Sequence, residues 1–223
     1  MTFLKNEEKN TFVERLYISL ILLRHGIGVN LRSGKLFYLT FSPHCLCYSL
    51  DLVRHGKTVA VEKGEFMSNS SKNSVLSASG ILELEGTAKE IDRMSPDVIL
   101  FAPIERTEKT FKILKKYLSC NPTVKKCEYM IGINNSVWGD KKFESLDYEN
   151  VYVFLQRECN HNIFVKSFDG DSWGDVLVRC ARLLKELNCH YASKKVLLVS
   201  QGSVFQAMKI LLHQNRHPWD GYS

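Results

Sequence analysis

The segment Leu50-Asp51-Leu52-Val53-Arg54-His55-Gly56 opens the regular part of the sequence. It is a short apolar run that ends in an arginine, a histidine and a glycine, as a buried strand does where it meets a loop. Two later runs, Val98–Phe101 and Val196–Val199, are almost wholly apolar and also lead into polar residues. We therefore expect three buried strands, each followed by a loop that carries polar side chains.

Segments with a helical repeat of apolar residues separate these runs. Their apolar side chains fall on one face at the period of an α-helix. Apolar strands that alternate with amphipathic helices are typical of a mainly parallel sheet that is covered on both faces. The sequence thus predicts an α/β fold, a three-layer α/β/α sandwich, with irregular structure over residues 133–150. The predicted helices are residues 81–91 with Ser77 or Ser79 as the N-cap, residues 107–118 after Pro103, residues 173–187 and residues 204–212.

Composition places the chain among soluble globular proteins. Its 223 residues are 44% hydrophobic and 24% charged, with a formal net charge of +6. The lysines and arginines are dispersed rather than gathered in one long run, so we expect no nucleic-acid partner. The apolar run of residues 16–23 is shorter than the roughly 20 residues of a membrane span, so we expect no membrane partner.

The cysteines bear on the cellular compartment. There are seven, at positions 45, 47, 120, 127, 159, 180 and 189, and no two have the C-x-x-C spacing. An odd number without that spacing argues against a disulfide framework and against a thiolate zinc site. A reducing compartment is the simpler setting, and we predict a cytoplasmic location.

Residues 1–47 differ in character from the rest of the chain. They hold two apolar runs, Tyr17–Leu23 and Leu36–Phe41, separated by glycine and asparagine turn signals. The two runs could be the strands of a hairpin, or the region could be a poorly ordered extension. We expect residues 1–47 to be an N-terminal extension and residues 48–223 to form the main domain.

Polar groups suited to phosphate follow all three predicted strands. Ligands bind outside the carboxyl ends of the strands in such a sheet. Arg54 and His55 follow the first strand, Arg106 comes shortly after the second, and Gln201 comes after the third. Two guanidinium groups can hold a phosphoryl group bidentately, and a neutral imidazole between them can attack phosphorus. These residue types in these places point to phosphoryl chemistry.

Five motifs in order resemble those of the histidine phosphatase superfamily, also called the phosphoglycerate-mutase-like family. Residues 52–58, LVRHGKT, resemble L-V-R-H-G-x-T, and residues 76–80, LSASG, resemble L-T-x-x-G. Residues 102–110, APIERTEKT, resemble S-P-L-x-R-x-x-x-T. Residues 170–172, GDS, resemble G-E-S, and residues 199–203, VSQGS, resemble V-S-H-G-G. The resemblance runs from about residue 49 to about residue 212, and each motif falls on the expected kind of element.

This resemblance implies a phosphoglycerate-mutase-like sandwich and a phosphomonoester hydrolase that works through a phosphohistidine. His55 would be the catalytic nucleophile, while Arg54, Arg106 and Gln201 would bind the substrate phosphate. The substrate would be a small phosphorylated molecule. No metal or other cofactor is expected, because the arginines supply the positive charge. The resemblance leaves the oligomeric state open.

The chain departs from the family pattern at two supporting positions. Gln201 occupies the place of the second active-site histidine, and glutamine can donate a hydrogen bond but carries no charge. Alignment on Trp138-Gly139 puts Asn135 where the family has its proton-donating glutamate, and asparagine cannot donate a proton to a leaving group. Asp140, Glu144 or Glu62 could substitute, and the sequence favours none of them.

These departures keep an alternative function open. A degenerate family member could bind a phosphorylated ligand or protein with little or no turnover. A mutase would need a more complete set of supporting residues, which makes it the weakest option. The chain also stops at Gly221-Tyr222-Ser223, where family members usually add another strand, so we expect a shortened C-terminus or a fragment.

A second Arg-His-Gly triplet occurs at residues 24–26, also after an apolar run. The motif at residues 76–80 follows His55 at the family's distance and lies too far from His25. Short motifs recur by chance, so we assign the nucleophile to His55. Trp138 is expected to serve packing rather than substrate binding.

Overall fold

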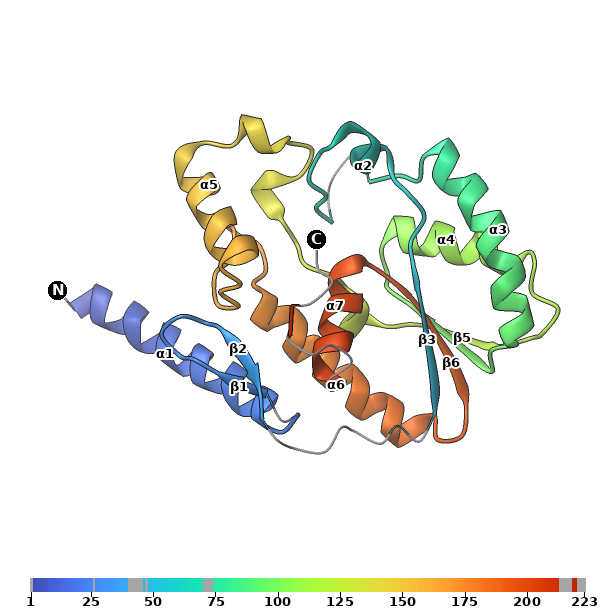
Figure 1. The fold of residues 1–223 in the computed structure, drawn as a ribbon, viewed down its shortest axis with the longest axis horizontal. Coiled ribbons are helices and arrows are strands. Elements are labelled where there is room, and N and C mark those ends of the chain that lie inside the picture. The colour runs from blue at the N-terminus through green and yellow to red at the C-terminus, as the bar shows by residue number, and fades with distance from the viewer. Residues whose placement is uncertain are drawn as a thin grey trace.

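The computed structural model describes residues 2–25, 27–39, 46, 48–69, 74–212 and 218–219, with the backbone alone for residues 2–10. Six strands and seven α-helices alternate along this part of the chain (Figure 1). Short 3₁₀ turns (η1–η3) and one π-helical segment (η4) lie between α4 and α6. The elements are α1 (Thr2–Leu23), β1 (Ile27–Val29), β2 (Leu36–Tyr38), β3 (Ser49–Arg54), α2 (Val59–Lys63), α3 (Ala78–Met94), β4 (Val98–Phe101), α4 (Glu105–Lys115), β5 (Thr123–Lys126), η1 (Glu128–Met130), η2 (Ser136–Trp138), η3 (Phe143–Ser145), α5 (Tyr148–Phe154), η4 (Leu155–Cys159), α6 (Trp173–His190), β6 (Lys195–Ser200) and α7 (Gly202–Leu211).

The main sheet has four strands in the order β3-β6-β4-β5, and all three pairings are parallel. The register pairs Arg54 with Ser200 and Phe101 with Val199, so three strands end near one another at the carboxyl edge. This confirms the predicted α/β fold with a mainly parallel sheet. The edge strand β5 is an addition to the three strands predicted.

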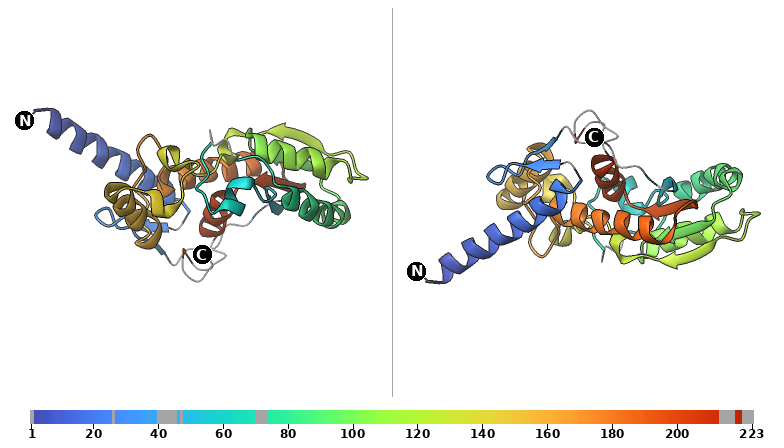
Figure 2. Two further views of the ribbon diagram at one scale, coloured as in Figure 1. Left: turned by 90° about the horizontal axis from the view of Figure 1, so that it is seen from above. Right: turned by 90° about the horizontal axis from the view of Figure 1, so that it is seen from below.

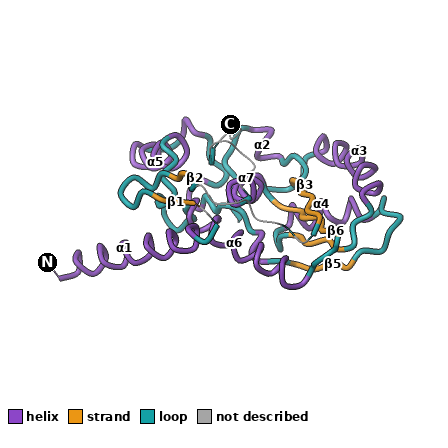
Figure 3. The backbone as a smooth tube through the Cα atoms, turned by 60° about the horizontal axis from the view of Figure 1, so that its bottom comes forward, coloured by secondary structure: helices purple, strands orange, loops and turns teal. Residues whose placement is uncertain are grey.

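Helices cover both faces of this sheet, as Figures 1 and 3 show. Side chains alternate between the two faces of a strand. On β6, Val196 and Leu198 pack into the core beneath α6 and α7, while Leu197 and Val199 pack into the core beneath α3 and α4. The central strands β4 and β6 are almost wholly apolar because both of their faces are buried, whereas the outer strands β3 and β5 are partly exposed. The helices on both faces of the sheet confirm the three-layer sandwich.

Local signals begin the two long helices of this domain. The hydroxyl of Ser77 accepts a hydrogen bond from Gly80 N, which makes Ser77 the N-cap of α3. Ser172 and Asp175 form a reciprocal capping box at the start of α6. Such caps satisfy backbone N–H groups that have no partner within the helix. Both helices therefore begin where the predicted motifs lie.

The N-terminal region corrects one expectation. Residues 17–23 belong to the helix α1 and are not a strand, whereas Leu36–Tyr38 does form one and pairs with Ile27–Val29. Ile18 and Leu22, one helical turn apart, are buried in the same core as α6. The apolar pattern of residues 17–23 fits either a strand or a helix, and contact with α6 favours the helix. The other end of α1 projects away from the body of the molecule (Figure 2).

Residues 133–150 contain short 3₁₀ turns and the start of α5, in line with the irregular structure expected there. The five cysteines within the described residues are free thiols, while Cys45 and Cys47 lie outside them. Gly221–Ser223, to which the expected C-terminal shortening refers, also lie outside. Among the described helices, none is long and apolar enough to cross a membrane.

Candidate active site

His55 lies directly after β3, at the carboxyl edge of the sheet. Its backbone N–H donates to Ser200 O at 2.9 Å, and the residue is 4% exposed. The ring atom Nδ1 lies 2.8 Å from Gly56 O. A carbonyl oxygen can only accept, so Nδ1 carries the hydrogen and Nε2 holds the lone pair. That Nε2 atom is buried and has no hydrogen-bond partner within the described part of the chain.

The environment of His55 keeps its imidazole neutral. Burial lowers the pKa of His55 to about 4, opposed by the hydrogen bond with Gly56 and helped by the positive charges of Arg106 and Arg54. Desolvation and nearby cations both disfavour the protonated ring. A neutral ring with a free Nε2 lone pair is the form that can attack an electrophile.

The loop after His55 is held by two helices. Gly56 N donates to the hydroxyl of Thr110 at 3.1 Å, and Thr110 in turn donates to Arg106 O in α4. At the start of α3, a Cβ on Gly80 would lie only 2.2 Å from Lys57 O. Glycine is therefore required where α3 meets this loop, and the two helices together fix the position of the histidine.

Arg106 is buried in the first turn of α4, only 1% exposed. Its Nη2 donates to Gln201 Oε1 at 2.5 Å, whereas Nε and Nη1 have no partner among the described residues. Burial lowers the pKa of Arg106 to about 10, so the guanidinium stays charged at neutral pH. A buried cation with unpaired donors is unfavourable unless an anion neutralises it.

Gln201 is the N-cap residue of α7 and is 5% exposed. Because its Oε1 accepts from Arg106, its amide Nε2 is the remaining donor, and this atom has no partner within the described chain. Arg54 lies beside the same turn, since a Cβ on Gly202 would be 3.6 Å from the Arg54 Cζ atom. All four predicted site residues thus meet at the carboxyl edge of the sheet.

A cavity of about 740 Å³ opens over this edge. Arg54, His55 and Gln201 line it, together with Phe66, Met67 and Asn135 from the loops above. Arg106 is not itself one of the lining residues, but it donates to Gln201, which is. Among the described residues, no group of three or more His, Cys, Asp or Glu side chains could hold a metal ion.

Asn135 is held by contacts on both sides of its amide. Its Nδ2 donates to Met67 O at 2.9 Å, and its Oδ1 accepts from Arg157 Nη2 at 2.7 Å. Arg157 is 2% exposed and stacks over the indole of Trp138 at 4.5 Å. Trp138 is fully buried, as expected for a packing residue. Asn135 therefore ties three segments together beside the cavity.

The three carboxylates named as possible proton donors do not line the cavity. Glu62 is exposed on α2 and accepts a hydrogen bond from Ser79 at 2.6 Å. Hydrogen bonds from Ser79 and Ser77 lower the pKa of the Glu62 carboxyl. Asp140 and Glu144 also lie outside the cavity lining. Arg24 and His25 of the second triplet do not line the cavity either, and its Gly26 lies outside the described residues.

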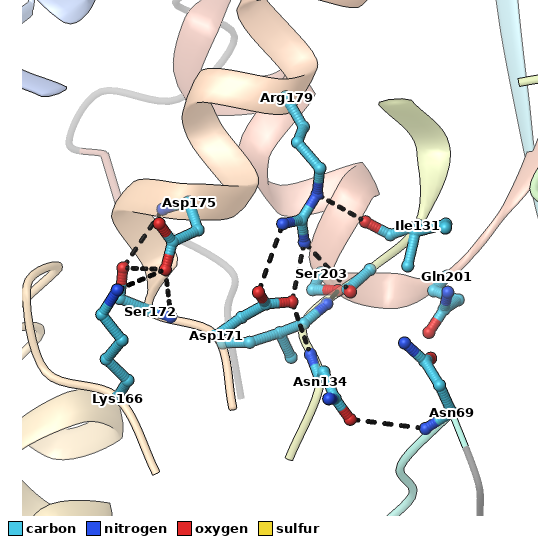
Figure 4. A network of polar contacts seen from close by, with 12 residues as sticks. Asn69, Ile131, Asn134, Lys166, Asp171, Ser172, Asp175, Arg179, Gln201 and Ser203 are labelled. Atoms are coloured by element: carbon cyan, nitrogen blue, oxygen red, sulfur yellow. Dashed lines mark hydrogen bonds and ion pairs between the residues drawn. The ribbon is translucent and has the colours of Figure 1, made fainter. Parts of the chain in front are cut away.

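A polar network that the sequence did not reveal supports the loop at residues 131–135 (Figure 4). Arg179 of α6 donates to Ile131 O, to Gly132 O and to the carboxylate of Asp171. Asp171 accepts from Asn134 N at 2.9 Å, and the hydroxyl of Ser203 accepts from Ile133 N at 2.9 Å. The G-D-S motif at residues 170–172 was the one available signal, and it indicated only the start of a helix.

Comparison with known proteins agrees with this arrangement. A sequence model of the histidine phosphatase superfamily (branch 1) matches residues 50–220. The chain resembles the structure of YhfR from Bacillus stearothermophilus, with a TM-score of 0.67 and 16% identity over 79% of this chain and 85% of that one. It also resembles a phosphoserine phosphatase from Entamoeba histolytica in complex with phosphoserine, with a TM-score of 0.63 and 20% identity over 77% and 82% of the two chains.

A third similar structure is a putative alpha-ribazole-5'-P phosphatase from Escherichia coli, with a TM-score of 0.60 and 20% identity over 74% of this chain and 77% of that one. At these identities the likeness establishes the fold. No curated protein matches the chain. The family match spans most of the sequence and includes the strand, the loops and the helices that build the cavity edge. The chain therefore belongs to the histidine phosphatase superfamily.

Proposed function

We propose that this protein is a phosphomonoester hydrolase that acts through a phosphohistidine on His55. The observation that carries this proposal is a set of buried polar atoms without partners among the described residues: His55 Nε2, Arg106 Nε and Nη1, and Gln201 Nε2. Leaving such a donor unpaired costs about 1–3 kcal/mol. A bound phosphoryl group would satisfy the three donors and place phosphorus before the nucleophile.

The reaction would proceed in two displacements. His55 Nε2 attacks phosphorus, a P–N bond forms, and the bond from phosphorus to the ester oxygen breaks. Arg54 and Arg106 stabilise the negative charge on the equatorial oxygens, and Gln201 adds a hydrogen bond. Water then attacks the phosphohistidine, the P–N bond breaks and inorganic phosphate leaves.

The proposed substrate is a small phosphorylated molecule. The cavity of about 740 Å³ has the size of a small-molecule site. The Entamoeba histolytica structure holds phosphoserine, and the Escherichia coli protein is a putative alpha-ribazole-5'-P phosphatase. These likenesses support a small phosphate ester as the class of substrate.

A second candidate function is phosphate binding without turnover. Asn135 favours it, because both ends of its amide are occupied by Met67 and Arg157 and it carries no acidic proton. In this alternative the arginines and Gln201 would still hold a phosphorylated ligand. Loss of proton donation would slow the chemistry by a factor of about a hundred or more.

Hydrolysis of p-nitrophenyl phosphate by wild type and by His55→Ala separates these functions. We expect turnover in the wild type, loss of turnover in the variant, and an acid-labile phosphoryl group on His55 in rapidly quenched samples. His190→Ala is the matched control, since His190 is exposed on α6 and pairs with Glu186 there. A wild type that binds vanadate but releases no p-nitrophenol would establish the binding function instead.

A further inference from the structure

The proposed reaction needs a proton for the leaving oxygen, because an alkyl phosphate would otherwise expel an alkoxide. General acids typically supply rate factors of about 10²–10⁴ in such steps. Asn135 cannot fill this role, and Glu62, Asp140 and Glu144 do not line the cavity. Among the described residues, two carboxylates share the cavity with His55, those of Glu65 and Glu158.

Both carboxylate oxygens of Glu158 have hydrogen-bond partners. Its Oε1 accepts from Arg157 Nε at 2.6 Å, and its Oε2 accepts from the Trp173 indole at 3.2 Å. One oxygen of Glu158 is thus engaged by the buried Arg157 and the other by Trp173, which gives this residue a structural role.

Glu65 lies on a backbone that is anchored from both sides. It follows Gly64, whose left-handed conformation (φ 69°) ends α2, and Glu65 N donates to Ala60 O at 2.9 Å. Its backbone also forms an isolated bridge with Lys142. The position of the residue is thus set by the turn after α2 and by the 140s loop.

The wall next to Glu65 is apolar and well packed. The ring of Phe66 contacts the rings of Trp138 and Phe154, with centroid separations of 5.5 and 5.6 Å. Phe66 N donates to Lys141 O at 2.8 Å. Glu65 is half-buried at the edge of this wall and lines the same cavity as His55.

We propose that Glu65 is the general acid of this enzyme, an assignment that rests on the function proposed above. The carboxyl group of Glu65 gives its proton to the ester oxygen as the bond between that oxygen and phosphorus breaks and the P–N bond to His55 forms. The resulting carboxylate then takes a proton from the water that attacks the phosphohistidine. Each cycle returns both residues to their starting states.

The test compares Glu65→Gln with wild type on two esters that differ in leaving group, O-phosphoserine and p-nitrophenyl phosphate. For phosphoserine, whose alkoxide needs a proton, we expect kcat/KM to fall by about 100-fold or more. For p-nitrophenyl phosphate, whose phenolate leaves unaided, we expect kcat/KM to change by less than about threefold. The variant should also accumulate phosphohistidine with the aryl ester, because its glutamine cannot activate water.

Glu62→Gln is the matched control, because Glu62 lies three positions earlier, is exposed and contacts Ser79 outside the cavity. It should leave both values of kcat/KM unchanged. Equal losses for the two esters in Glu65→Gln, or no loss for phosphoserine, would overturn the assignment of Glu65 alone. A wild type that hydrolyses neither ester would instead overturn the proposed hydrolase function.

Discussion

The surroundings of His55 determine the charge of its ring and the free-energy cost of protonating it. Its ring is buried beside two cations, and its Nε2 has no partner within the described residues. Burial removes the water that would otherwise solvate a protonated ring, and the arginines repel the same charge. The same surroundings that leave the nucleophile neutral at physiological pH also make it costly to protonate.

This cost predicts a pH-dependent stability. The folded-state pKa of His55 is about 4, below the ordinary value of 6.5, so the unfolded chain binds more protons between those values. The contribution of His55 is fully present above pH 6.5 and is lost as the pH falls toward 4. We expect wild type to lose up to about 3 kcal/mol more free energy of unfolding than His55→Asn across this interval. Urea titrations at several pH values measure the difference, and parallel pH profiles of the two proteins would contradict it.

At the scale of elements, the site depends on how closely α3 approaches the loop after His55. Gly80 allows this approach, because a Cβ there would lie 2.2 Å from Lys57 O and 2.6 Å from Lys57 N. These are backbone atoms, which cannot move without shifting the loop. The L-S-A-S-G motif therefore does two things: it begins α3, and its glycine allows the helix to pack against the active-site loop.

Gly80→Ala is expected to lower the free energy of unfolding by about 1–3 kcal/mol through overpacking, and to lower kcat/KM by displacing His55. Gly86→Ala is a control on the same helix, where nothing lies within 4 Å of the added Cβ. That variant should stabilise the protein by about 0.5–1 kcal/mol, because alanine is a better helix former than glycine. Chemical denaturation and steady-state assays measure both effects. Similar stabilities for the two variants would rule out the close approach.

At the scale of the whole molecule, the N-terminal region shares its core with the main domain. Ile18, Leu22 and Ile27 are buried with residues of α6 such as Leu177. Arg182 of α6 also donates to the Tyr17 hydroxyl at 2.7 Å. We propose that residues 1–47 act as an extension that stabilises the domain through α6 and takes no part in the chemistry.

Leu22→Ala tests this role. Removal of a fully buried leucine side chain should lower the free energy of unfolding by about 2–5 kcal/mol, while kcat/KM stays unchanged below the unfolding transition. Leu20→Ala, on the same helix but 54% exposed, should change the stability by less than about 0.5 kcal/mol. Equal stabilities of the two variants in urea titrations would show that α1 contributes nothing to the core.

The parts of the fold that local pattern could predict are those where packing repeats along the chain. Short apolar runs mark the strands β3, β4 and β6, and apolar residues at helical spacing mark the helices α3, α4, α6 and α7, so these elements were predictable. The edge strand β5 has the sequence Thr-Val-Lys-Lys and is mostly exposed, so it carries no such pattern. The run at Tyr17–Leu23 was ambiguous until its contact with α6 was known.

The sequence by itself determined the sandwich and the polar groups at the ends of its strands, because parallel strands place their carboxyl ends at one edge. Arg54, His55, Arg106 and Gln201 were predictable for that reason. Only the tertiary structure decided that Asn135 is tied to Met67 and Arg157, and that Glu65 faces the cavity whereas Glu62 does not. These relations join loops far apart in the chain, and irregular loops take their conformation from the packing of the whole molecule rather than from a local repeat.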